Sequence, residues 1–197
     1  MTCKGRNLQA MNRLNRDQLP AVPPSVRTTR ERTLLRRVRV FTLVFIVGLV
    51  VSGATAIPLN WELDLLVKWF GLEGQTSATA TSELGRWLLT AHEALQDVNA
   101  KHPLLFYGTD WLAFGHFVIA IAFVGALLDP VRNIWLFTFG MIACVLVIPY
   151  ALIFGAVRGI PIWWRLIDCS FGVFGFIPLW FCRKCVRELV RVTNTSM

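Results

Sequence analysis

Three ionisable side chains lie within long apolar stretches of this sequence, where a charge is costly and usually functional. They are His116, Arg165 and Asp168. Arg165 and Asp168 are three residues apart, so on a helix they share a face and are close enough to form an ion pair. Side chains of these types can take up and release protons. They are therefore candidates for proton-coupled transport, or for redox or transfer chemistry within a membrane.

The spacing of these residues from interfacial tryptophans predicts a common depth. His116 follows Trp111 by five residues, about 7.5 Å at the helical rise, and Asp168 follows Trp164 by four residues, about 6 Å. Tyr150, in the apolar stretch between them, is placed to reach the same layer. The sequence predicts one polar cluster of these side chains. The alternative is a structural Arg–Asp ion pair beside a histidine that only packs.

A second candidate is the thiol pair of Cys182 and Cys185, whose C-x-x-C spacing encloses two basic residues that favour the thiolate. A zinc site needs four ligands, and no second pair or histidine lies near this one in the sequence. Four-span thiol–disulfide enzymes that pass electrons to a quinone carry their cysteine pairs on the outer face, whereas this pair is predicted at the cytoplasmic end. We favour two unrelated cysteines at a helix end.

Haem held by two histidines is a further alternative. His116 is the one histidine in an apolar stretch, and His92 or His102 would have to pair with it from the preceding polar segment. The sequence has no phosphate-binding loop and no metalloprotease or serine-hydrolase motif. We therefore expect no cofactor and no metal.

Four apolar runs must position these residues. A hydrocarbon core about 30 Å thick needs roughly 20 apolar helical residues to cross it. The runs are Val40–Trp61, Trp111–Leu128, Asn133–Val157 and Ile160–Cys182. The mean hydropathy of +0.54 agrees with several spans. The predicted fold class is an all-α integral membrane protein with four transmembrane helices and a short amphipathic helical segment between the first and second.

This fold class divides the chain into five segments. Residues 1–36 are predicted to form a basic, mostly disordered cytoplasmic tail, and a helix that begins within 27–39 runs into the first span. The first transmembrane helix is predicted at 37–59 and an extracytoplasmic amphipathic segment at 60–109. A block of three transmembrane helices follows at 110–185, and a cytoplasmic tail at 186–197.

The first span carries a small residue at every fourth position, Gly48, Ser52 and Ala56, and this pattern predicts a smooth face for close helix packing. A rival interpretation is a signal-peptidase site at residues 54–56. The 39 residues ahead of the apolar run are far longer than an ordinary signal peptide carries, so we expect a retained span.

The segment 60–109 contains two amphipathic patterns. Trp61, Leu65 and Trp69 share one helix side, which suits a helix in the membrane interface. A second helix is predicted from Ser82 as its N-cap to a point before Pro103. Its apolar stripe, at 84, 87, 88, 91, 95 and 98, either covers the bundle or docks a partner.

The distribution of charge predicts the orientation. The net charge is +8, and residues 1–39 carry ten basic against two acidic residues, which is the whole excess. With both termini inside, fifteen basic residues are cytoplasmic and five are outside, as the positive-inside rule requires. We expect a bacterial plasma (inner) membrane, with both termini in the cytoplasm. Nucleic-acid binding is not expected, because no folded basic surface with stacking aromatics accompanies the tail.

Two classes of function remain open. The first is a non-enzymatic accessory, assembly or interaction component of a membrane complex, whose partners are the lipid bilayer and a membrane protein or a second copy of the chain. The second is a small proton-coupled transporter, or a membrane-bound redox or transfer enzyme, that uses the predicted cluster of His116, Arg165 and Asp168 with Tyr150. The first is the interpretation we favour.

Overall fold

The computed structural model describes residues 24–194, and this part of the chain is all helical. The predicted disordered tail lies largely outside the described residues. Six α-helices and one short 3-10 helix follow one another in this order: α2 (Pro24–Thr55), α3 (Leu59–Trp69), α4 (Glu83–Lys101), η1 (Pro103–Phe106), α5 (Tyr107–Leu128), α6 (Ile134–Val157) and α7 (Ile162–Asn194).

Four of these helices, α2, α5, α6 and α7, are long and apolar enough to cross a membrane. In each, only 11% to 22% of the most apolar stretch is buried inside the protein. Large apolar side chains therefore cover the outside of the bundle, as they do on helices that face lipid. The four predicted spans are confirmed as long apolar helices.

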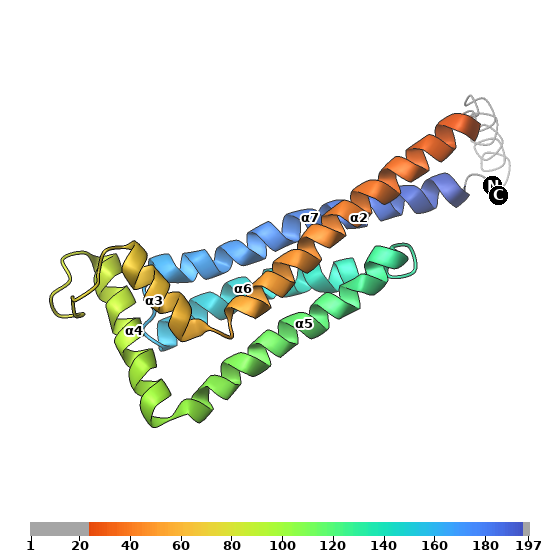
Figure 1. The fold of residues 1–197 in the computed structure, drawn as a ribbon. Helices are drawn as coiled ribbons and strands as arrows, with labels where there is room; N and C mark the ends of the chain where they lie inside the picture. Colours follow the sequence, from red (N-terminus) through yellow and green to blue (C-terminus); the bar gives the residue numbers. More distant parts are fainter. Residues whose placement is uncertain (1–23, 195–197) are drawn as a thin grey trace, which may run out of the picture.

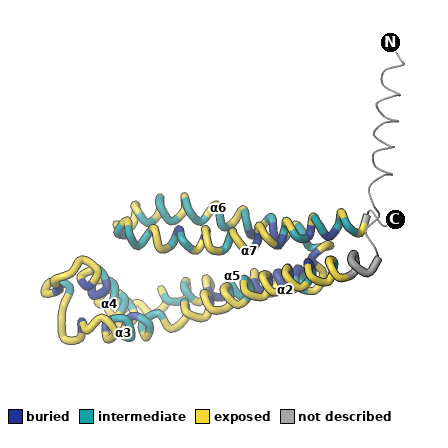
Figure 2. The backbone as a smooth tube through the Cα atoms, turned by 90° about the horizontal axis from the view of Figure 1, so that it is seen from above, coloured by how far each residue is buried: buried dark blue, intermediate teal, exposed yellow. Residues whose placement is uncertain are grey.

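The four long helices form two layers, with α2 beside α5 and α6 beside α7 (Figure 2). Helix α2 also packs along α7 and so joins the layers, while α5 and α6 touch much less. Helices α3 and α4 form a head at one end, and the start of α2 and the end of α7 lie at the other (Figure 1).

Two helices are longer than predicted. Helix α2 begins at Pro24 and ends at Thr55, because Pro58 disfavours helical geometry at the residue before it. The predicted first span, to residue 59, therefore overran the helix. Helix α7 does not end near Cys182 but continues to Asn194, since neither glycine nor proline follows Pro178 within it.

The main core lies in the half of the bundle away from the head. Its centre is built from Val38, Phe123, Phe137 and Leu179, all completely buried. These four side chains come from α2, α5, α6 and α7, one from each. The core therefore fixes all four helices to one another at this end.

Glycines set the close approaches between helices. A Cβ atom at Gly172 would lie 2.5 Å from the carbonyl oxygen of Cys144, so α7 and α6 touch backbone to backbone there. At Gly53 a Cβ atom would lie 2.9 Å from Cβ of His116 on α5. No helix of this chain packs on the predicted smooth face, because a Cβ atom added at Gly48 would have no atom within 4 Å and Ser52 is exposed.

The head has a small core of its own, built by α3, α4 and the loop between them. Its buried members are Leu63, Val67, Leu72, Ala80, Leu88 and Leu89. Helix α4 begins as predicted, with the hydroxyl of Ser82 accepting a hydrogen bond from the backbone N–H of Gly85 at 3.0 Å, and it ends before Pro103. The buried side of α4 differs from the predicted apolar stripe, because Leu89, outside the stripe, is buried and Leu84, within it, is 37% exposed.

The tryptophan side of α3 faces outward. Trp61 and Trp69 are 63% and 76% exposed, whereas Leu63 and Val67 on the other side pack against α4. Helix α3 therefore carries two apolar faces, one for the head core and one exposed. An exposed face rich in tryptophan is typical of a helix at a membrane interface.

Candidate functional site

Arg165 lies near the start of α7 and reaches across to α6. Its Nη1 donates a hydrogen bond to the carbonyl oxygen of Leu152 at 3.3 Å. Its aliphatic stem lies on Gly155, where an added Cβ atom would be 2.5 Å from Cδ of the arginine. Arg165 therefore ties α7 to α6. Its Nε is buried without a hydrogen-bond partner in the described part of the chain.

Asp168 is half-buried one turn further along α7. Although it is three residues from Arg165, no ion pair joins the two among residues 24–194. The ion pair does not form because the guanidinium group of Arg165 points to the backbone of α6. The helical spacing allowed the pair but did not determine it.

His116 lies on α5 and faces α2. Its Nδ1 is 2.8 Å from the carbonyl oxygen of Leu112, one turn earlier on the same helix, and its Cβ packs on Gly53. A nitrogen that bonds a carbonyl oxygen carries the proton, so Nε2 of the neutral ring is left as an acceptor. This imidazole belongs to the contact between α2 and α5, whereas Arg165 belongs to the contact between α6 and α7.

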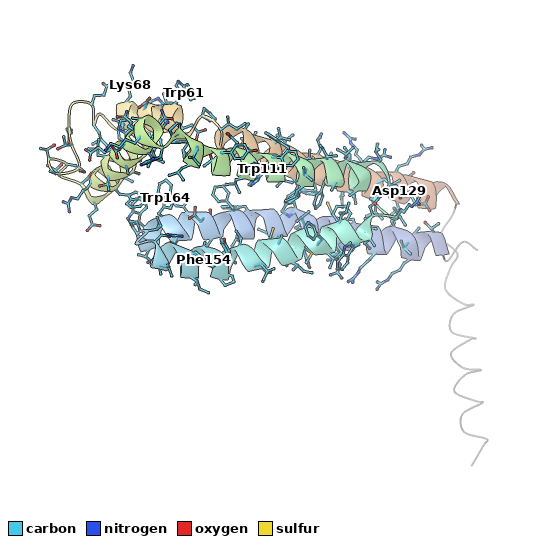
Figure 3. All side chains as sticks on the ribbon, turned by 90° about the horizontal axis from the view of Figure 1, so that it is seen from below. Trp61, Lys68, Trp111, Asp129, Phe154 and Trp164 are labelled. Carbon is cyan, nitrogen blue, oxygen red and sulfur yellow. The ribbon has the colours of Figure 1, made fainter. Side chains whose placement is uncertain are left out.

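Tyr150 lies on the outside of α6. It is 64% exposed, and its ring packs on Phe154 with the ring centres 4.4 Å apart. Figure 3 shows Trp164 next to the head and Asp129 towards the opposite end of the bundle. No hydrogen bond or ion pair joins any two of the four predicted residues in the described part of the chain.

The cysteines are packing residues. All four in the described part of the chain are free thiols. Cys182 is buried in the main core, where its Sγ donates to the carbonyl oxygen of Val38 at 3.6 Å and lies 3.7 Å from Oγ1 of Thr42. Cys185 is one turn further on and half-buried. The C-x-x-C spacing here places two thiols on one helix flank and forms no disulfide.

One polar cluster in the head was not predicted. Nε2 of His92 lies 2.6 Å from Oδ1 of Asp64 and 3.0 Å from Nε2 of Gln96. These contacts join α3 to α4, so His92 is engaged within the head rather than paired with a histidine of the bundle. The only signal in the sequence was the four-residue spacing of His92 and Gln96, which alone does not point to Asp64.

A second set of hydrogen bonds in the head joins the loop before α4 to α4 itself. The carboxylate of Glu93 accepts hydrogen bonds from the backbone N–H of Ser77 at 2.9 Å and from its hydroxyl at 2.7 Å. These bonds to the charged form lower the pKa of Glu93 below its ordinary value. Both polar clusters in the head join one element of the head to another. In residues 24–194 no group of three or more histidine, cysteine or acidic residues could hold a metal ion.

Comparison of the chain with protein-family models, with curated proteins and with solved structures found no match.

Proposed function

We propose that this protein is a four-span integral membrane protein that acts as a non-enzymatic accessory, assembly or interaction component of a membrane complex. The observation that carries the proposal is that the polar side chains of the long helices make separate contacts instead of one shared cluster. His116 and Arg165 each serve a separate helix contact, and neither joins Asp168. Catalysis and proton transfer need groups within hydrogen-bond reach of one another or of a shared water.

We place the head outside the cell and both termini in the cytoplasm of a bacterial plasma (inner) membrane. The support is charge: fifteen of the twenty basic residues belong to the segments that we assign to the cytoplasm, and the segment 60–109 has three basic against six acidic residues. The head lies at the end of the bundle opposite the start of α2 and the end of α7 (Figure 1).

The head supplies the surface for a partner. Its exposed apolar side chains include Trp61 and Trp69 on α3, Phe70 just after α3, and Leu104 and Leu105 just after α4. None of them belongs to the core between α3 and α4. Exposed apolar groups gathered on one element mark sites of contact with protein or membrane.

Purification in mild detergent tests this proposal. We expect a second polypeptide to accompany the tagged protein in fixed ratio, and the double variant Trp61→Ser/Trp69→Ser to lose it. Arg86→Gln, an exposed change on α4, serves as the control and should keep it. A protein that purifies alone, with a bound chromophore or with proton-coupled uptake lost in Asp168→Asn, would favour the transporter or enzyme instead.

A further inference from the structure

A cavity of about 560 Å³ lies at the end of the bundle opposite the head, where α7 continues beyond the apolar stretch. Its walls come from α7 and from Arg30 at the start of α2. It lies beside the main core, in which Cys182 and Val186 occupy the side of α7 that faces α2. The cavity therefore lies beside the packed contact between α2 and α7.

The cavity is strongly basic. Among the described residues, five basic side chains line it, against one carboxylate: Arg30, Arg183, Lys184, Arg187 and Arg191, with Glu188. The carboxylate of Glu188 is already used, because it forms an ion pair with Arg30. This pair braces the wall formed by the two helices. The net charge of +4 around one cavity favours an anion with several oxygen acceptors.

The lining changes from apolar to charged along α7. Trp180 stands at the apolar end, and the ammonium group of Lys184 lies 5.3 Å from the centre of its ring. From Trp180 to Arg191 is eleven residues, about 16 Å along the helix. The ring therefore marks the level at which lipid headgroups meet hydrocarbon, and the arginines extend beyond it.

We propose that this cavity binds the phosphate headgroup of an anionic phospholipid from the cytoplasmic leaflet. Basic pockets beside transmembrane helices on this side are suited to such headgroups. The apolar part of the ligand also has a surface to follow, since Phe174, Ile177 and Phe181, within two turns of Trp180, are 72%, 48% and 41% exposed. A soluble phosphate would use the arginines but leave this adjoining surface unused.

The chain's own N-terminal residues are poorly matched to the cavity in charge. Residues 1–23 carry four basic side chains, Lys4, Arg6, Arg13 and Arg16, against the single carboxylate of Asp17. Like charges in one cavity repel. The lipid proposal rests on the protein being embedded in a membrane but not on its having a partner, so lipid binding and partner capture can fail separately.

Native mass spectrometry of the full-length protein in detergent tests the proposal. The protein is titrated with phosphatidylglycerol and with phosphatidylcholine as the neutral comparison. We expect phosphatidylglycerol to bind in a one-to-one complex, and Arg183→Gln/Arg187→Gln to weaken it about 25-fold, at about fivefold for each basic residue removed. The matched control is Arg36→Gln/Arg39→Gln, which removes the same charge from exposed positions of α2 outside the cavity and should leave binding unchanged.

Three outcomes would overturn the proposal. Equal weakening in the two double variants would show diffuse attraction to charge rather than a site. Equal binding of the two lipids would show that the net negative charge of the headgroup does not contribute to binding. Displacement of phosphatidylglycerol by an equimolar amount of inorganic phosphate would identify a soluble anion as the ligand. Melting curves of both double variants, alike within error, exclude loss of folding as the cause.

Discussion

Gly172→Ala should lower the thermal midpoint of the protein in detergent by about 5 °C. The added Cβ atom would lie 2.5 Å from the carbonyl oxygen of Cys144 and 2.7 Å from Cγ1 of Val147, and a backbone atom cannot move aside as a flexible side chain can. Overpacking of this kind costs about 1–3 kcal/mol, and in a chain of this size each kcal/mol shifts the midpoint by about 2–4 °C. Helices α6 and α7 would have to separate.

Gly48→Ala is the matched control for this experiment. It makes the same chemical change within a long apolar helix, at a point where nothing lies within 4 Å of the added atom. Its midpoint should stay the same or rise slightly, because alanine favours a helix more than glycine does. The change in tryptophan fluorescence on heating measures both variants. Similar losses in the two would mean that α6 and α7 do not touch at Gly172.

The second large effect is expected in the head. Leu88→Ala removes a side chain that is 2% exposed in the core between α3 and α4. Deleting a buried leucine side chain to alanine costs about 3 kcal/mol. Opening of the head should then become easier by about a hundredfold. Hydrogen exchange of the amides of α3 and α4 should speed up by that factor, while exchange in α6 and α7 stays as it was.

Leu84→Ala provides the comparison, since Leu84 is on the same helix one turn earlier and is 37% exposed. A surface change of this kind alters stability by no more than about 0.5 kcal/mol. The predicted stripe included both leucines as buried residues, whereas in the structure Leu88 is buried and Leu84 is exposed. If both variants exchange at the same rate, α4 does not pack on α3 through Leu88.

The long apolar helices were predictable because length and composition alone decide them. The run from 134 to 157 has no charge, and its helix ends within one residue of the predicted limits. The end of α7 was not predictable in this way. Residues 183–194 are polar enough to read as a tail, but they continue the helix because the flank with Val186 and Leu189 is buried against the neighbouring helices.

The polar residues show where sequence reasoning stops. Spacing from the interfacial tryptophans predicted one depth for His116 and Asp168, which concerns only their position along the helices. Rotation about each helix axis was not determined by spacing. It is set by contacts such as Gly53 against His116 and Gly155 against Arg165, each of which joins two different helices. The contact of Asp64 with His92 could not be predicted for the same reason.

Alkaline phosphatase fusions, active only outside the cytoplasm, give the most direct test of the central claim that four spans separate the head from the termini. Fusions would be made after His102, Val131, Gly159 and Met197, each in a connection or at the end of the chain. We expect activity after His102 and Gly159 and none after Val131 and Met197. Activity after Met197, or none after His102, would contradict the claim.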